Sequence, residues 1–160
     1  MTDDRHAQLT GASLGKLRDL FATLPPPSAA MRDGFFRARF IGPFWLRAPA
    51  PLSVHLMGLP NWQGKRFQTP DTATNRVIRN GQETEYLCMT LLPGPSLVDG
   101  KDGLALHYLV QPDGTASPAP WRWVRDELRA LDDDTLLGMT VIDQPLLRLL
   151  AFPFLLERAG

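Results

Sequence analysis

The sequence predicts a mainly β protein, a closed antiparallel β-barrel with one helix near the N-terminus. Apolar and polar residues alternate in short runs after residue 34, as expected for strands with one buried face. Turn residues such as Asn80-Gly81 separate neighbouring runs, and the connections are short and sequential. This spacing favours an up-and-down barrel over a sandwich, and a barrel of about eight strands just holds one small ligand.

The predicted helix covers residues 13–24. Apolar residues recur at three- and four-residue steps from Leu14 to Leu24, which places them on one stripe. Ser13 is a suitable N-cap, because its hydroxyl can accept a hydrogen bond from a free amide of the first turn. Three prolines at 25–27 end the helix, since proline has no backbone N–H to donate.

Roughly eight to ten short strands are expected after the helix. Asn80-Gly81 is the clearest hairpin signal, because both residues tolerate the positive φ that a type I′ turn requires. Short helical turns are expected at 28–32 and 145–150. The predicted strands lie at 36–40, 52–56, 62–67, 74–79, 83–92, 104–110, 121–128, 135–142 and 152–157.

Length and charge indicate one domain and exclude some classes of partner. The chain has 160 residues, from which we expect a loose tail at 1–12 and a single barrel domain at 13–160. Its 17 basic and 17 acidic residues cancel, so no long-range attraction to nucleic acid is expected. No run approaches the roughly 20 apolar residues of a membrane span. The cytoplasm is the expected compartment, and nothing in the sequence indicates the oligomeric state.

The sequence reads Trp-Gln-Gly-Lys-Arg-Phe at 62–67, Asp-Asp-Asp-Thr-Leu-Leu-Gly-Met at 132–139 and Gly-Phe-Phe-Arg-Ala at 34–38. These segments resemble a bacterial family named for a Gly-x-Trp-x-Gly motif, together with the domain of unknown function that follows it. The first two are the most specific matches; at the motif itself, Phe36 replaces the tryptophan and Ala38 replaces the last glycine. The resemblance implies a barrel fold of lipocalin-like type and brings no established activity.

Metal, haem and nucleophile chemistry find little support in the residues. His55 and His107 are candidates for an axial haem ligand, as in haem-binding barrels, but an ordinary hydrogen-bonded histidine is the favoured interpretation. Cys88 is the only cysteine, which excludes a disulfide and the usual thiolate zinc sites. Ser96 lacks the Gly-x-Ser-x-Gly elbow of hydrolases. We therefore expect no cofactor, neither metal nor haem.

The candidate site is an apolar cavity inside the barrel. Trp62, Trp123 and Tyr108 are expected to line it, with Lys65 or Arg125 as its polar anchor. Trp62 and Lys65 are three residues apart, so a bulge at Gly64 would be needed to bring both inward. An inward Arg125 would favour a ligand carboxylate through a two-pronged hydrogen bond.

Two classes of function fit this site, and a third remains open. The preferred hypothesis is binding of a small apolar molecule, with or without a carboxylate or carbonyl head. The alternative is a cofactor-independent enzyme that uses the same cavity for isomerisation, cyclisation or hydrolysis. A buried carboxylate or histidine facing a Lys, Arg or Tyr would favour catalysis. A barrel with a filled interior that works through protein contacts is the third class.

Overall fold

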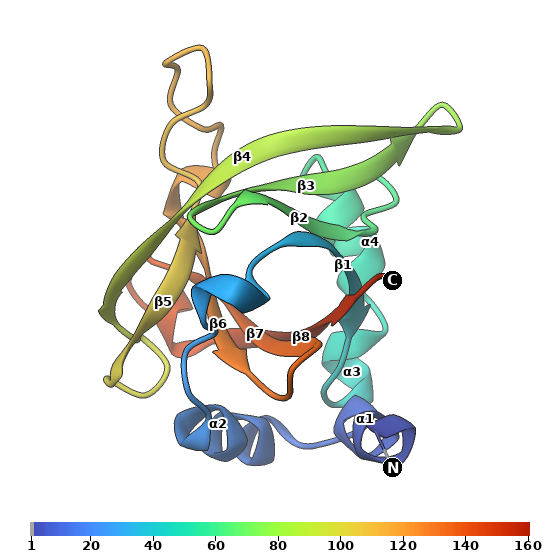
Figure 1. Cartoon of the computed structure of the whole chain (residues 1–160), viewed down its shortest axis with the longest axis vertical. Helices are drawn as coiled ribbons and strands as arrows, with labels where there is room; N and C mark the ends of the chain where they lie inside the picture. The colour runs from blue at the N-terminus through green and yellow to red at the C-terminus, as the bar shows by residue number, and fades with distance from the viewer. Residues whose placement is uncertain (1) are drawn as a thin grey trace.

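The computed structural model describes residues 2–160, with side chains from residue 4 onward. It is a closed barrel of eight antiparallel strands in which each strand pairs with the next and the last pairs with the first (Figure 1). The prediction of a mainly β barrel with an N-terminal helix is confirmed. The strands are β1 (Gly34–Phe40), β2 (Gly64–Thr69), β3 (Thr72–Arg79), β4 (Gln82–Pro95), β5 (Asp102–His107), β6 (Val124–Ala130), β7 (Thr135–Ile142) and β8 (Ala151–Arg158).

The helices are short and lie outside the strands. Ser13 caps α2 as expected, because its hydroxyl accepts a hydrogen bond from the Lys16 amide at 3.2 Å. In the described part of the chain, no helix has the length and apolar character needed to cross a membrane. The helices are α1 (Thr2–Thr10), α2 (Leu14–Thr23), α3 (Phe44–Arg47) and α4 (Ala50–Leu56), with 3-10 turns η1 (Ala29–Met31), η2 (Trp121–Trp123) and η3 (Leu147–Leu149).

Two segments differ from the sequence-based expectations. Residues 2–10 of the expected loose tail form α1, and its His6 is buried with Nδ1 3.0 Å from Glu157 of β8. The predicted strand at 52–56 is the helix α4. Its Leu52 and Leu56 are exposed, and only Val54 of the alternating set packs against the core. The alternation was misleading there because no strand lies beside this segment to give it a buried face.

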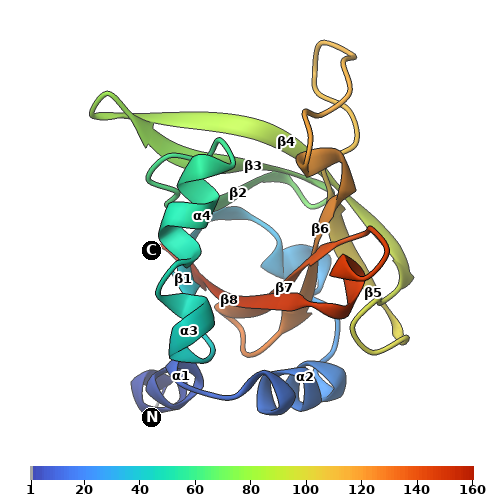
Figure 2. The same cartoon turned by 180° about the vertical axis from the view of Figure 1, so that it is seen from behind.

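Alternate residues of the strands face two different apolar clusters. One cluster lines the barrel interior, and the other lies between the outer face of β7 and β8 and the helix α2. Figures 1 and 2 show α2 beside these two strands, outside the barrel. Leu17 and Phe21 of α2 are fully buried on this outer face, each stabilising the fold by about 1.5–3 kcal/mol through burial. The strand β7 is apolar on both faces because one faces the interior and the other faces α2.

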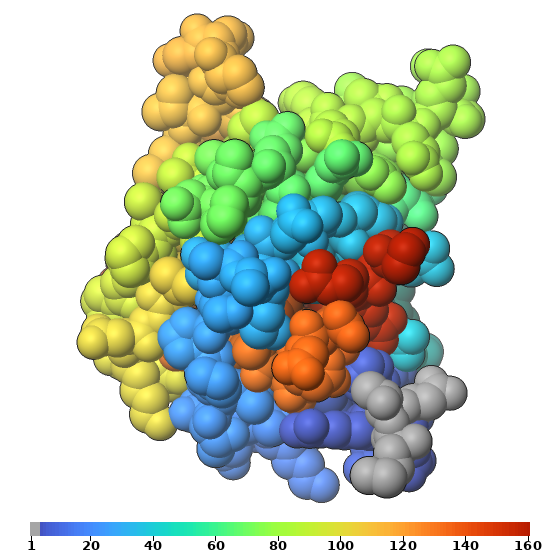
Figure 3. Space-filling view, in the orientation of Figure 1, coloured from blue at the N-terminus to red at the C-terminus, as the bar shows by residue number. Residues whose placement is uncertain are grey.

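The two ends of the barrel differ. Long connections at 41–63, 108–123 and 143–150 gather at one end, where α3 and α4 lie nearest the viewer in Figure 2. The opposite end faces the viewer in Figure 3, and η1 and its neighbours close over the interior there. The barrel interior is therefore reached from the α3–α4 end, which we call the open end.

Candidate functional site in the barrel interior

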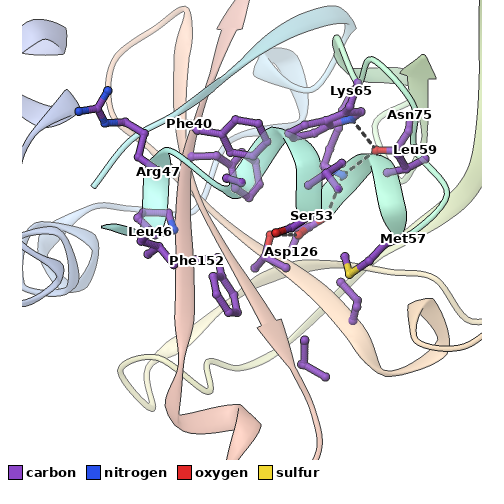
Figure 4. Close-up of a pocket in the computed structure, with 18 of the residues that line it drawn as sticks. Phe40, Leu46, Arg47, Ser53, Met57, Leu59, Lys65, Asn75, Asp126 and Phe152 are labelled. Atoms are coloured by element: carbon purple, nitrogen blue, oxygen red, sulfur yellow. Dashed lines mark hydrogen bonds and ion pairs between the residues drawn. The ribbon is translucent and has the colours of Figure 1, made fainter. Parts of the chain in front are cut away.

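The barrel encloses a cavity of about 260 Å³ that opens at the α3–α4 end (Figure 4). Its walls are mainly aromatic and aliphatic, and the polar side chains among its lining residues include Lys65, Asn75, Tyr108, Asp126 and Thr140. Apolar walls with a few convergent polar groups are typical of small-molecule sites.

Lys65 lies at the centre of the polar group. Its ammonium nitrogen is 2.8 Å from Asp126 Oδ2, 2.7 Å from the Tyr108 hydroxyl and 3.0 Å from Asn75 Oδ1. The residue is 1% exposed, so its charge is held almost entirely by these partners. We call Lys65, Asp126, Tyr108 and Asn75 the Lys65 cluster. Its members come from β2, β6, the segment after β5, and β3, respectively, so the cluster joins four parts of the barrel.

Burial shifts the pKa values of two of these groups, Lys65 and Tyr108, away from their ordinary values. Burial lowers the pKa of Lys65, and the neighbouring Asp126 carboxylate opposes that shift. Burial and the same carboxylate raise the pKa of Tyr108 well above its usual range. Tyr108 therefore stays a neutral phenol at physiological pH, and its hydroxyl donates to Asp126 Oδ2 at 3.0 Å. Asp126 is held on its other oxygen by the Thr140 hydroxyl at 2.6 Å.

Aromatic rings form the walls beside this group. Trp62 donates its indole N–H to Asn75 Oδ1 at 3.1 Å and meets the Phe154 ring edge-on at 5.9 Å. Gly138 of β7 stands opposite Phe154 of β8, and a Cβ on this glycine would lie 2.2 Å from the Phe154 ring. The absence of a side chain at Gly138 thus makes room for the ring that supports Trp62.

Three of the five residues predicted for the site line the cavity. They are Trp62, Lys65 and Tyr108. Both Trp62 and Lys65 are inward, as the expected irregularity at Gly64 would allow. Trp62 lies before β2 begins, and Gly64 adopts φ +151°. Regular strand alternation therefore does not apply between the two side chains.

The expectations for Trp123 and Arg125 are wrong. Trp123 is 39% exposed and does not line the cavity. Arg125 lies on the outer face of β6, where its guanidinium binds Glu127 and the Pro95 carbonyl oxygen. The predicted strand began too early: residues 121–123 form η2, and the strand starts at Val124. The even residues Val124, Asp126 and Leu128 face the interior, so Arg125 cannot be the anchor.

Asp126, Asn75 and Trp121 also line the cavity but were not among the five residues predicted for the site. One signal was present for Asp126. Arg125 and Asp126 must face opposite sides of a regular strand, and a buried lysine needs a nearby acid or anion. Choosing Lys65 as the inward cation therefore favoured an inward acid, which Asp126 supplies. No comparable signal singles out Asn75 or Trp121.

The other polar candidates lie away from the cavity. His55 is exposed on α4, and His107 is half-buried on β5 outside the cavity lining. Burial, and secondarily the charge of Glu85, raises the pKa of the Cys88 thiol, which disfavours a reactive thiolate. Among residues 4–160, no three or more His, Cys, Asp or Glu side chains are grouped so as to hold a metal ion.

His107 should make the protein less stable below neutral pH. Its burial, and next the charge of Arg125, lower the pKa of the imidazole below 6.5. Below pH 6.5 the unfolded chain therefore binds more protons at this site, and the free energy of unfolding falls as pH drops through that window. Urea unfolding at about pH 7.5 and about pH 5 should show this slope. The decrease in the free energy of unfolding between these two pH values should be smaller in His107→Gln. It should be unchanged in His55→Gln, the control at an exposed site. Equal decreases in the wild type and both variants would contradict the prediction.

Comparisons with known proteins support the fold alone. No protein-family model and no curated protein sequence matches the chain. Among solved structures, the chain is similar to a crystal structure of a protein from Thermomonospora curvata, with a TM-score of 0.70. The two share 21% identity over 99% of this chain and 96% of the other. The resemblance to the Gly-x-Trp-x-Gly family stays a prediction.

Proposed function

We propose that the protein binds a small apolar molecule in the barrel cavity, with a polar part of that molecule at the Lys65 cluster. The supporting observation is the cavity itself, which is lined mainly by apolar side chains and contains one group of convergent polar residues (Figure 4). The cluster disfavours a carboxylate head. Asp126 already neutralises Lys65, so a ligand carboxylate would be a second anion beside one cation.

The cavity volume indicates the size of the ligand. An apolar protein cavity of about 150 Å³ holds benzene, so this cavity of about 260 Å³ has room for roughly ten carbon atoms. Naphthalene is therefore a suitable apolar probe. The partner in this proposal is a compact, mostly hydrocarbon molecule rather than a long-chain lipid.

Naphthalene binding tests the proposal. Titration should quench or shift the tryptophan fluorescence, because Trp62 and Trp121 line the cavity. Val54→Trp replaces a small side chain in the cavity wall with a bulky indole ring and should weaken binding at least tenfold. Leu92→Trp makes the same kind of change on an exposed part of β4 and should leave binding intact. Native mass spectrometry of the purified protein would identify a natural ligand that co-purifies.

Two results of the naphthalene titration would contradict the proposal. If the wild type does not bind naphthalene, or if Val54→Trp binds it as tightly as the wild type does, the cavity does not take an apolar molecule. Circular dichroism of each variant separates this result from a failure to fold.

A second function has its own supporting observation. A buried carboxylate contacts both a lysine and a tyrosine of shifted pKa, which is the arrangement expected of an acid–base enzyme. In this alternative, Tyr108 or Lys65 polarises a ligand carbonyl and Asp126 takes the proton on the adjacent carbon. An isomerase or cyclase would use such a step.

Deuterium exchange into 1-tetralone tests the alternative. This apolar ketone has about the size that the cavity accepts, and its exchangeable protons lie next to the carbonyl. If the alternative is correct, NMR will show that the protein speeds deuterium incorporation above the rate in buffer alone. The double variant Lys65→Met with Asp126→Leu should not speed it. Exchange at the buffer rate would leave binding as the supported function.

A further inference from the structure

In the Lys65 cluster every polar hydrogen is already donated to a protein acceptor, whereas some oxygen atoms can still accept a hydrogen bond. The three N–H bonds of the ammonium have Asp126, Tyr108 and Asn75 as acceptors. The Tyr108 hydroxyl donates to Asp126, and the Trp62 indole donates to Asn75. These polar hydrogens are therefore already committed to acceptors within the protein.

The remaining donors are also occupied. The Thr140 hydroxyl donates to Asp126 Oδ1. The Asn75 amide group lies within hydrogen-bond distance of the Leu87 carbonyl oxygen and the Tyr108 hydroxyl. Within the group around Lys65, a carbonyl, ether or carboxylate on a ligand would thus find no donor that is free to bind it; Arg47, the other cation of the lining, lies on α3 outside this group.

Acceptor capacity does remain, and it lies in the cavity wall. Asp126 Oδ1 accepts one hydrogen bond, from Thr140, within the described part of the chain, and a carboxylate oxygen can accept two. The Thr140 oxygen accepts none from the described residues. Both residues line the cavity, and Asp126 carries the negative charge that strengthens a hydrogen bond.

We infer that the ligand is an uncharged apolar alcohol or phenol whose O–H donates to Asp126 Oδ1. This inference rests on the proposed binding function and names the ligand class of the same cavity. A ligand hydroxyl supplies the missing donor without changing the charge of the Lys65–Asp126 pair. An ammonium would also donate, but it would add a second cation beside Lys65.

A matched series of bicyclic probes tests the inference. The series is naphthalene, 2-naphthol, 2-methoxynaphthalene and the 2-naphthoate anion, whose members differ mainly in the polar group. We expect 2-naphthol to bind the wild-type protein on the order of 10- to 100-fold more tightly than naphthalene, as a hydrogen bond to a charged acceptor provides. The methyl ether should show no such gain, and 2-naphthoate should bind most weakly.

A double variant provides the control. Lys65→Met with Asp126→Leu removes both charges together, and replacing a buried ion pair with apolar residues of similar volume is often neutral for folding. It should bind 2-naphthol no more tightly than naphthalene. Equal affinities of the wild type for naphthalene and 2-naphthol would overturn this inference, as would tighter binding of the ether or the acid. Absence of naphthalene binding would instead overturn the proposed function.

A different observation concerns the outer surface of the open end. Thirteen large apolar side chains of the described residues are exposed, and eleven of them belong to the three long connections at this end. A monomeric protein rarely gathers exposed apolar side chains in this way unless the surface contacts another apolar phase. We call this set the apolar rim. It consists of Phe44, Trp45, Leu52, Leu56, Leu109, Val110, Trp123, Leu146, Leu147, Leu149 and Leu150.

Arginines accompany the apolar rim. Arg47 lies over the Phe44 ring at 5.9 Å, and Arg122 lies over the Trp123 ring at 5.3 Å. Neither forms an ion pair within the described residues, and Arg47 donates one hydrogen bond, to the Gly42 carbonyl oxygen at 3.4 Å.

Connection 41–63 has no acidic residue, whereas 108–123 has Asp113 and 143–150 has Asp143. Asp143 pairs with Arg148 at 2.8 Å, so the three connections together keep an excess of one positive charge. Aromatic and leucine side chains flanked by unpaired arginines are characteristic of surfaces that bind anionic membranes.

We propose that the open end docks on a lipid bilayer that carries anionic headgroups. The apolar rim would enter the headgroup boundary while Arg47 and Arg122 contact phosphate. The cavity opens at the same end, so an apolar ligand would pass between bilayer and barrel without crossing bulk water. This surface is independent of the ligand class argued above.

Co-sedimentation with vesicles tests the docking surface. The protein should bind vesicles of equal parts phosphatidylglycerol and phosphatidylcholine, and bind less to phosphatidylcholine alone. Trp45→Ser with Leu52→Ser should reduce binding at least fivefold. Tyr86→Ser with Leu92→Ser, which changes the two exposed apolar residues outside the rim, should not.

Self-association is the competing occupant of this surface. Sedimentation velocity of the wild type and of the rim variant would reveal it. A dimer that dissociates in Trp45→Ser with Leu52→Ser, combined with no vesicle binding by the wild type, would overturn membrane docking in favour of a second copy of the chain.

Discussion

Replacement of Asp126 with asparagine should lower the free energy of unfolding by about 3–5 kcal/mol, because it leaves the buried Lys65 ammonium without its counter-charge. The loss should depend on pH in a definite direction. Burial already lowers the pKa of Lys65, and removal of the carboxylate takes away the interaction that opposes this shift. Below its ordinary pKa, the unfolded chain then binds a proton that the folded chain releases. Stability therefore rises with pH in that window, and the defect shrinks as pH approaches 10.5.

Urea unfolding of Asp126→Asn at about pH 7 and about pH 9 would measure both effects. The double variant Lys65→Met with Asp126→Leu is the matched control, because it removes both charges. It should recover most of the loss, to within about 1–2 kcal/mol of the wild type. A double variant as unstable as the single variant would mean that shape and packing at this position, rather than the unpaired charge, account for the loss.

Gly64→Ala should destabilise the barrel by about 2–5 kcal/mol, the second large effect. Gly64 has φ +151°, a conformation that residues with a side chain rarely adopt. An added Cβ would lie 2.0 Å from the Phe36 carbonyl oxygen of β1, and backbone cannot move aside as a flexible side chain can. Gly64 also sets the directions of Trp62 and Lys65, so naphthalene affinity should fall with stability.

Gly94→Ala is the control for this prediction. Gly94 lies in β4 with open space around its Cα, and its φ is not in the positive region. Thermal unfolding of the two variants should show a large loss for Gly64→Ala and a change within about 1 kcal/mol for Gly94→Ala. Similar losses in both variants would indicate that any added methyl weakens these strands.

Local patterns in the sequence were sufficient for several elements. The stripe from Leu14 to Leu24 with Ser13 before it predicted α2, and the cap hydrogen bond is present. The run 135–142 predicted β7 with the same bounds, and Asn80-Gly81 marks the β3–β4 hairpin. These predictions succeeded because periodicity, capping and turn chemistry act between residues that are close in the chain.

The face of each strand was harder to predict than the strand itself. For β6, Trp123 and Arg125 were chosen because their even spacing places them on one face, but Trp123 lies in η2 before the strand and the opposite face, with Asp126, lines the cavity. Alternation shows which residues share a face, but the face that becomes the interior depends on where the strand starts and how the barrel closes. The same limit made α4 resemble a strand, because its alternation had no neighbour against which to be judged.

The sequence alone determined the class of fold, the helix α2, most of the strands, and three of the cavity residues, including Lys65. Only the tertiary structure decided that Lys65 pairs with Asp126, that Asn75 and Tyr108 complete its hydrogen bonds, and that the exposed apolar residues gather at the open end. Lys65 and Asp126 lie far apart in the chain, and barrel closure alone brings them to 2.8 Å. Local periodicity carries no information on such a distance, whereas the cost of an unpaired buried charge makes the pairing decisive for the folded state.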